Sequence, residues 1–411
     1  MDKQGQTVSG RPVLSRWIET IWSADARHAL PAILILGFAL RVLAAAVVPD
    51  QSAALGDADA YRASGHALWA TGQTGTPFHM PLYPALVAVT GPGWTQLLID
   101  IGLSTVTIWL VYQLTNSIFR DGRIALLAAF FTSIYPFFIF YSIVGLSETL
   151  FVTLLLASYL SWYRSKYVVG AVFAVLAILT RPIFDLVAPI LVLCFALVTE
   201  RRTIGASILK LAAYVAIYCA LMTPWWLHNY QAYGQFVRLN PGGGMALYSA
   251  NNPFNQSGGF DTNLKESQAP FDRIADPVER DKALQRAAFN YILQDPMNFL
   301  VQAFRRFERF WYPWPYAEQY SDIRFKIISL CSFVPILLLA LAYLVIWGRA
   351  DFRRIAPLLL FGAYLTSIHM FFPGSLRYRL PLEPFLIIFA AAGMVRLMAR
   401  WITAGTAASA K

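Results

Sequence analysis

Long runs of apolar residues dominate the chain and alternate with shorter polar segments. A helix needs about 20 mainly apolar residues to cross the hydrocarbon core of a bilayer. The runs lack the two-residue alternation of membrane barrel strands, so helices are favoured. The pattern predicts ten membrane-spanning helices, at 30–48, 94–116, 124–143, 147–163, 167–181, 184–199, 206–224, 325–347, 355–372 and 384–400.

Basic residues at the ends of these runs predict the orientation, because short cytoplasmic loops of membrane proteins carry an excess of Lys and Arg. The basic loops are predicted to be cytoplasmic, with both termini inside and the two long polar segments outside. The basic residues are Arg120, Arg123, Arg164, Lys166, Arg201, Arg202, Arg349, Arg353, Arg354 and Arg400. The predicted parts are a cytoplasmic segment 1–29, a seven-span core 30–224 with its first outer loop 49–93, a periplasmic loop 225–324, C-terminal spans 325–400 and a cytoplasmic tail 401–411.

The two outer segments are predicted to contain helices of their own. Residues 59–71 form a short amphipathic pattern, and the second half of 225–324 gives two helical pieces broken at Asp295-Pro296. Aromatic and arginine side chains accompany the second piece, which is typical of helices that lie in the membrane interface. We therefore expect an all-α polytopic membrane protein with about ten transmembrane helices and extracytoplasmic interfacial helices.

Composition agrees with a membrane protein and excludes several other classes. The chain is 57% hydrophobic and 14% charged, whereas soluble domains carry about 25% charged residues. The net charge of +10 comes from Lys and Arg at the ends of apolar runs, so nucleic acid is not an expected partner. The three cysteines lie in apolar runs, so no disulfide framework is expected. We find no cluster with zinc-ligand spacing and no phosphate-binding Gly-Lys-Ser/Thr loop.

Acidic residues occur at two outer helix ends. Asp57 and Asp59 follow the first predicted span, and Glu148 begins the fourth. Carboxylates in such places act as general bases or metal ligands, but Asp also favours helix starts. Asp59 fits the helix-start role well. Glu148 either caps its helix or serves a function, because a carboxylate facing the bundle is costly without a partner.

Several basic residues also lie close to the outer face. Arg41 lies inside the first span, where it either forms a structural ion pair or reaches Asp57, Glu148 or a phosphate. Arg181 ends the fifth span, and Asp185 is the nearest candidate partner in sequence. Arg377 and Arg379 lie together on a short outer loop, against the usual charge bias. Guanidinium groups suit phosphate or diphosphate, and binding to surface lipid is the alternative. His79, at the membrane surface, is a weaker candidate for contact with an anionic headgroup.

The order of these motifs resembles that of GT-C glycosyltransferases, and most closely the bacterial members of glycosyltransferase family 39. That group includes the lipid A aminoarabinose transferases and is related to protein O-mannosyltransferases. The resemblance covers most of the chain. It rests on Asp57-x3-Tyr61, Pro81-Leu82-Tyr83-Pro84, Ser147-Glu148-Thr149-Leu150-Phe151, Thr180-Arg181-Pro182, Thr223-Pro224-Trp225-Trp226, Asn251-Asn252-Pro253 and Arg377-Tyr378-Arg379-Leu380-Pro381.

The resemblance implies a bacterial inner-membrane glycosyltransferase with its active site facing the periplasm. It would transfer a hexosyl or pentosyl group, with inversion, from a polyprenyl-phosphate donor such as undecaprenyl phosphate to an acceptor hydroxyl. Asp57 would be the general base, and Glu148 would orient the acceptor, the sugar or a Mg²⁺ or Mn²⁺ ion. Cations would stabilise the departing phosphate. The expected substrate- and phosphate-binding residues are Arg377, Arg379, Tyr61, His79, Arg181, Arg41, Asp59 and Asn251.

The sequence departs from the family pattern at two positions. His79 stands where relatives of the aminoarabinose type carry a lysine, and Ala58 stands where many relatives carry a second acidic residue. We assign no cofactor. The expected partners are the bilayer, the lipid-linked donor and an acceptor that is a lipid, a glycan or a protein, and we expect a monomer.

Two other functions stay open from the sequence. One is a carrier or flippase for a lipid-linked saccharide, and the other is a ligase or polymerase of lipid-linked glycans. A carrier is less favoured, because the chain shows no internal repeat and its candidate residues gather at the outer interface instead of mid-membrane.

Overall fold

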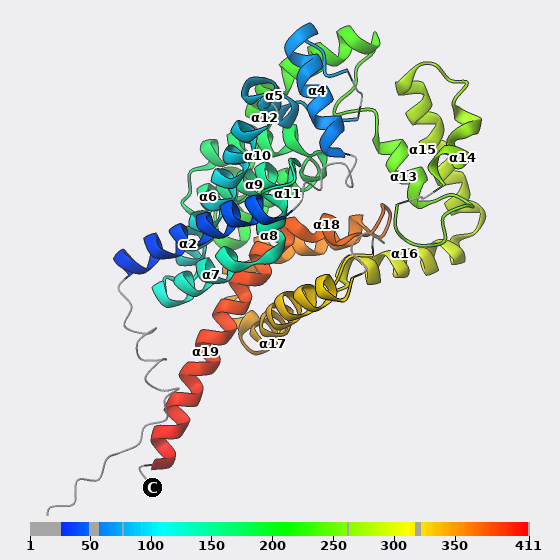
Figure 1. Cartoon of the computed structure of the whole chain (residues 1–411). Helices are drawn as coiled ribbons and strands as arrows, with labels where there is room; N and C mark the ends of the chain where they lie inside the picture. The colour runs from blue at the N-terminus through cyan, green and yellow to red at the C-terminus, as the bar shows by residue number, and fades with distance from the viewer. Residues whose placement is uncertain are drawn as a thin grey trace, which may run out of the picture.

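The computed structural model describes residues 26–48, 57–75, 78–91, 93–260, 263–316 and 322–409. All regular elements in these ranges are helical, which confirms the predicted all-α class. Residues 1–25, the segment 49–56 and the last two residues lie outside the described residues. The helices form one bundle with a smaller helical lobe beside one end of it (Figure 1).

Five segments are long and apolar enough to cross a membrane, and they agree with the prediction of a multi-pass membrane protein. The number of ten spans is not confirmed. The five segments comprise α2 (Ala26–Val47), α6 (Trp94–Phe119), α12 (Ile204–Tyr233), α17 (Ile323–Ile368) and α18 (Leu376–Arg379) continued by α19 (Glu383–Ser409). Shorter helices occupy the other predicted spans: α7 (Gly122–Ile134), α8 (Pro136–Tyr141), α9 (Glu148–Tyr163), α10 (Tyr167–Thr180), α11 (Val187–Cys194) and the π-helix η2 (Phe195–Thr199).

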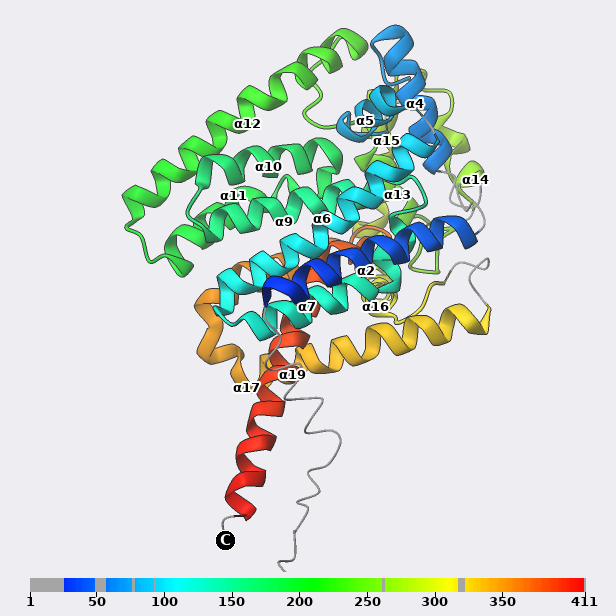
Figure 2. The same cartoon turned by 60° about the vertical axis from the view of Figure 1, so that its left-hand side comes forward.

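The predicted spans differ from the observed helices in three places. The span 124–143 is broken at Tyr135, which is extended because Pro136 follows it and begins α8. The helix predicted over 206–224 continues to Tyr233, past an internal proline. The spans 325–347 and 355–372 belong to one helical element, α17, and the loop expected between them is helical. Figure 2 shows that α17 changes direction between its yellow first part and its orange second part.

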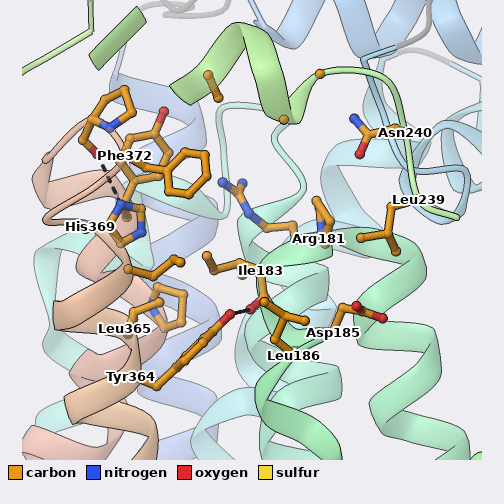
Figure 3. A pocket seen from close by; sticks show the side chains of 18 of the residues that line it. Arg181, Ile183, Asp185, Leu186, Leu239, Asn240, Tyr364, Leu365, His369 and Phe372 are labelled. Atoms are coloured by element: carbon orange, nitrogen blue, oxygen red, sulfur yellow. Dashed lines mark hydrogen bonds between the residues drawn. The ribbon is translucent and has the colours of Figure 1, made fainter. Parts of the chain in front are cut away.

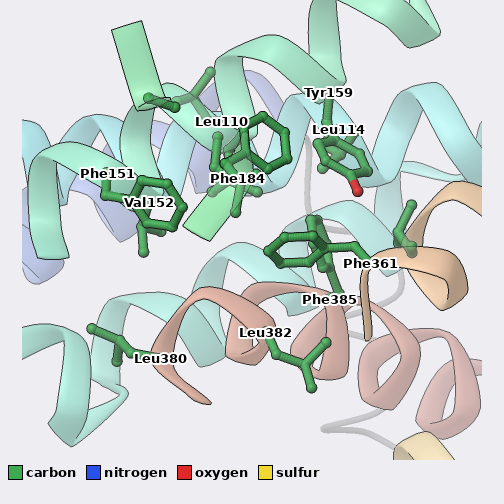
Figure 4. Close-up of a cluster of buried hydrophobic side chains, with 14 of the residues drawn as sticks. Leu110, Leu114, Phe151, Val152, Tyr159, Phe184, Phe361, Leu380, Leu382 and Phe385 are labelled. Atoms are coloured by element: carbon green, nitrogen blue, oxygen red, sulfur yellow. The ribbon is translucent and has the colours of Figure 1, made fainter. Parts of the chain in front are cut away.

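The core lies where α6, α7, α9, α10 and α19 pack together. Small residues allow the closest approaches: a Cβ on Gly170 of α10 would lie 2.3 Å from the Trp162 ring of α9, and close packing at small residues is typical of membrane helices. Figure 4 shows side chains from the ends of several helices meeting in this core. They include Leu110, Leu114, Phe151, Val152, Tyr159, Phe184, Phe361, Leu380, Leu382 and Phe385.

The outer segments form helices largely where the sequence predicts them. The expected helix near 59–71 is α4 (Asp57–Thr71), which packs on α5 (Leu82–Thr90). The break expected at Asp295-Pro296 separates α15 (Pro277–Gln294) from α16 (Pro296–Trp311). Short helices complete this layer: η1 (Pro182–Phe184), α13 (Gly243–Ala250), α14 (Leu264–Gln268), η3 (Ala269–Phe271) and η5 (Leu380–Leu382).

Candidate active site

Four charged side chains from distant parts of the sequence form a continuous cluster. Arg377 of α18 donates from Nη1 to Oδ2 of Asp57 at 2.5 Å, and from Nε to Oε1 of Glu148. Nη1 of Arg181, which follows α10, lies 2.7 Å from the same Glu148 oxygen. The cluster therefore contains two carboxylates and two guanidinium groups, and its formal charge is zero.

Helix ends place these side chains together. Asp57 and Glu148 are the first residues of α4 and α9, where the helix dipole stabilises a carboxylate. Arg181 stands just beyond the last residue of α10, where Pro182 begins η1. Arg377 follows a cap in which its own backbone N–H donates to the Ser375 hydroxyl at 3.3 Å.

The two carboxylates lie in different environments. The Glu148 side chain is 1% exposed, whereas the Asp57 side chain is 51% exposed. A buried carboxylate is stable only if it is paired and hydrogen-bonded, and the two arginines provide this for Glu148. Its second oxygen, Oε2, has no hydrogen-bond partner among the described residues. Asp57 is therefore the carboxylate that a substrate can reach, and Glu148 is an internal counter-charge.

Tyr61 and His79 form one wall of the cluster. The Tyr61 hydroxyl lies 2.9 Å from Oγ of Ser147, which also accepts from Nη1 of Arg181 at 3.2 Å. The Tyr61 ring stacks on His79 at 4.0 Å between centroids, and Ser64 Oγ lies 3.3 Å from His79 Nδ1. Burial raises the pKa of Tyr61 and lowers the pKa of His79 from 6.5. His79 is consequently neutral at pH 7 and contributes shape and hydrogen bonding instead of positive charge.

A cavity of about 380 Å³ opens beside the cluster. Glu148, Arg181 and Arg377 line one part of it, and most of the remaining wall is apolar. Figure 3 shows the Arg181 side chain pointing toward His369 and Phe372 across this space. The apolar wall includes Ile183, Leu186, Leu239, Leu365, Ile368 and Phe372. An apolar cavity with a few convergent polar groups is the usual form of a ligand site.

Two arginines predicted for the site lie elsewhere. Arg41 is fully buried and donates to Ser104 Oγ, to the Gly37 carbonyl and to the Ser133 carbonyl. Neither the contact with Asp57 or Glu148 nor the structural ion pair considered from the sequence is formed, because Nε and Nη1 bond to neutral groups of the bundle, and Nη2 has no hydrogen-bond partner among the described residues.

Arg379 is also fully buried, and its Nε donates to Glu383 at 2.6 Å. Its Nη1 donates to the carbonyls of Phe310 and Tyr312. Arg377 and Tyr378 of α18 line the cavity, whereas Arg379 does not, so the phosphate contact expected of Arg379 gains no support. Arg379 instead joins the end of α16 to the start of α19.

Asn251 and Asp59 have structural partners. The Asn251 amide donates to the Leu247 and Phe371 carbonyls, and its oxygen accepts from buried Arg306. Asp59 is exposed and pairs with Arg62 at 3.1 Å. Asn251 therefore fastens the outer lobe, and Asp59 takes the helix-start position considered from the sequence.

The pairing expected between Arg181 and Asp185 is wrong as well. Arg181 pairs with Glu148, whereas Asp185 accepts from the Tyr218 hydroxyl and pairs with Arg238. Arg238 lines the cavity and was not predicted. It lies in a polar outer segment where one more arginine gives no signal in sequence.

The donor set does not resemble a metal site. No group of three or more His, Cys, Asp or Glu side chains suited to a metal occurs in the described part of the chain. Asp57 and Glu148 converge on the Arg377 guanidinium, which lies where a shared cation would have to bind. The residues present therefore do not fit the Mg²⁺ or Mn²⁺ ion considered from the family resemblance.

The fold is similar to that of solved oligosaccharyltransferase structures. The archaeal oligosaccharyltransferase AglB from Archaeoglobus fulgidus, in complex with an inhibitory peptide and a dolichol-phosphate, gives a TM-score of 0.58 at 15% identity, covering 96% of this chain and 52% of that one. The same enzyme in its apo form gives 0.58 at 14% identity with the same coverage. With a tethered acceptor peptide containing the NVT sequon it gives 0.57 at 13% identity, covering 94% and 50%.

This chain spans about half the length of those structures. The likeness shows a shared fold. Comparisons with protein-family models and with curated protein sequences give no match.

Proposed function

We propose that the chain is a membrane glycosyltransferase that moves a sugar from a polyprenyl-phosphate donor to an acceptor hydroxyl. The observation that carries this proposal is a largely apolar cavity lined by three arginines, two of which pair with Glu148, beside an accessible carboxylate. A prenyl chain suits the apolar wall, and a phosphate suits the planar guanidinium groups of Arg181 and Arg377. Asp57 is the group that accepts a proton.

Donor binding changes the charge balance of the cluster. The four charges sum to zero without substrate, and the phosphodiester of the donor adds one negative charge. The phosphate competes with Asp57 for Arg377, because Asp57 is the half-exposed partner and Glu148 is buried. Donor binding therefore releases the Asp57 carboxylate, and Glu148 keeps both arginines in place.

The transfer itself is a single displacement with inversion at the anomeric carbon. The acceptor oxygen attacks this carbon from the face opposite the phosphate, and its proton passes to the Asp57 carboxylate. The bond between the anomeric carbon and the phosphate oxygen breaks, and polyprenyl phosphate leaves with the electron pair. Arg181 and Arg377 stabilise the negative charge that grows on this oxygen. Glu148, which the resemblance assigns to the acceptor or sugar, acts here by holding the arginines.

The solved structures with the same fold support a lipid-linked donor, since one of them contains dolichol-phosphate. The periplasmic orientation, the bacterial inner membrane, membership of family 39, the predicted domain boundaries and a monomeric state remain our proposals from the sequence. The sugar and the acceptor are identified by comparing the lipids and glycans of cells with and without the gene by mass spectrometry. A missing sugar decoration would name both.

Purified protein then tests the assignment of Asp57. With the identified polyprenyl-phosphate sugar and acceptor, Asp57→Asn is expected to lose transfer by at least about a hundredfold, the usual contribution of a general base. Asp59→Asn is the matched control, because Asp59 is exposed on the same helix and pairs with Arg62. Near-normal turnover by Asp57→Asn would refute the base assignment. Transport of the intact lipid-linked sugar without release of polyprenyl phosphate would favour a carrier.

A further inference from the structure

A second cavity of about 290 Å³ lies between the end of α2, the start of α6 and the segment before α9. Ile143, Val144 and Gly145 line this second cavity, whereas Glu148, three residues further on, lines the first. The short turn before α9 therefore contacts both cavities. The proposed donor does not occupy the second cavity, so the polar residues that line this cavity need a separate explanation.

Asp100 is the most unusual residue of the second cavity. Its side chain is buried, and Oδ2 accepts a hydrogen bond from the Tyr83 hydroxyl at 2.9 Å. Its other oxygen, Oδ1, has no partner within the described ranges of the chain. A buried polar atom without a hydrogen bond is destabilising. A ligand that brings a hydroxyl donor into the cavity would remove this cost.

Two neighbours of Asp100 extend the polar surface. Gln96 lies one helical turn before Asp100 and donates from its amide nitrogen to the Tyr83 hydroxyl at 2.9 Å. Gln96 also lines the cavity, so its side-chain amide is a second polar group of the wall. Trp94, at the start of the same helix, lines the cavity and is 75% exposed.

We propose that the second cavity binds the acceptor substrate and that the acceptor is a glycan; this rests on the proposed function. A sugar ring presents several hydroxyl groups at its rim, which match the Asp100 carboxylate and the Gln96 amide. It also presents a face of C–H groups, which packs on the negative face of an indole ring. A serine or threonine side chain brings one hydroxyl and would match only one of the two polar groups.

The position of the second cavity suits an inverting displacement. Arg62 of α4 lines it, while Asp57 at the start of the same helix contacts Arg377, which lines the first cavity. The start of α4 therefore carries a residue of the second cavity's wall and the carboxylate that contacts the first cavity's Arg377. A proposed acceptor in the second cavity would have to approach Asp57 from the side away from the phosphate, as inversion requires.

Direct binding to the purified full-length protein tests this site without any transfer reaction. The probes are tetrasaccharides of glucose, galactose, mannose and N-acetylglucosamine, and tetrapeptides containing Ser or Thr, each titrated by ligand-observed NMR. At least one tetrasaccharide is expected to bind saturably. Asp100→Asn is expected to weaken tetrasaccharide binding about tenfold or more, as for loss of a hydrogen bond to a charged group. Trp94→Ala is expected to weaken it to a similar extent through loss of the stacking face, and Trp94→Phe is expected to restore most of the affinity.

Trp69→Ala is the matched control, because Trp69 is 76% exposed and lines neither cavity. Trp94 is exposed, so its variants do not endanger folding. Three results would each overturn the inference: binding of the peptides alone, binding of no probe, or tetrasaccharide binding that Trp94→Ala leaves unchanged. The last two results would mean that water fills the second cavity.

A transfer assay separates this inference from the proposed function. Trp94→Ala is expected to raise the KM for the acceptor about tenfold, and the control Trp69→Ala is expected to change neither this KM nor the slow hydrolysis of the donor by water. An unchanged acceptor KM in Trp94→Ala would refute the acceptor site. If the wild-type protein uses no polyprenyl-phosphate donor, the proposed function fails, while tetrasaccharide binding still decides what the second cavity holds.

Discussion

Glu148→Gln is expected to reduce both stability and activity, whereas Asp57→Asn is expected to reduce activity alone. Glu148 is buried against two arginines, and its substitution leaves their guanidinium groups without this counter-charge. Removing one partner of a buried ion pair costs about 3–5 kcal/mol. We expect about 3 kcal/mol here, because both arginines keep some exposure. Asp57 is 51% exposed, and an exposed ion pair contributes at most about 1 kcal/mol.

The assay is thermal unfolding in detergent, followed by tryptophan fluorescence, together with the transfer rate measured well below the unfolding temperature. The double variant Glu148→Gln/Arg181→Met removes a charge from each side of the pair. It is expected to regain much of the stability, since replacing both partners of a buried pair is often neutral. It should not regain transfer, because a phosphate ligand is lost. An unfolding temperature of Glu148→Gln equal to that of the wild type would refute the role of Glu148 as a buried counter-charge.

Three further predictions concern neighbouring residues. Arg377→Lys is expected to lower transfer about tenfold or more, because a lysine ammonium cannot contact two carboxylates and a phosphate in the bidentate manner of a guanidinium; unchanged kcat/KM would contradict this. Asp57→Asn is expected to bind the donor more tightly than the wild type, because the phosphate no longer competes with a carboxylate for Arg377; weaker binding in a donor titration would place Asp57 on the donor itself. Folding lowers the pKa of His79, so His79 takes up a proton in the unfolded chain at a higher pH than in the folded protein. The contribution of His79 therefore lowers the free energy of unfolding below about pH 6.5 and leaves it constant above that pH. His79→Gln should remove that part of the pH dependence of the unfolding temperature, and an identical profile would show that another group causes it.

The sequence predicts much of this site because its residues mark helix ends. Four charged residues lie at boundaries between polar and apolar segments on the side predicted to be extracytoplasmic: Asp57, Glu148, Arg181 and Arg377. Charged groups at such boundaries need partners of opposite sign, and the ends of neighbouring helices are the available places. The four residues meet in one cluster because the helix ends that carry them lie side by side in the bundle.

The errors come from contacts that the sequence pattern does not contain. Arg41 is a buried cation inside a predicted span, as expected, and Arg379 is buried although it was expected on an exposed loop. The partners of both include backbone carbonyls of distant segments. Every residue offers a carbonyl, so no sequence signal selects the acceptor. The helical connection within α17 was missed for a related reason. The charged residues after Trp347 suggest a loop, but they are also compatible with a helix, and tertiary packing determines which of the two forms.

The pairing of Asp57 with Arg377 at first sight argues against a base, since a carboxylate held in an ion pair is not free to accept a proton. Competition with the donor resolves this conflict. Without donor, the cluster is neutral and Asp57 is held by Arg377. With donor, the phosphate takes over the guanidinium, and the carboxylate is released when an anomeric carbon is present beside it. Glu148 makes this exchange possible, because its burial keeps Arg181 and Arg377 in position through both states. The two carboxylates therefore differ in role because they differ in exposure, which the order of residues along the chain does not reveal.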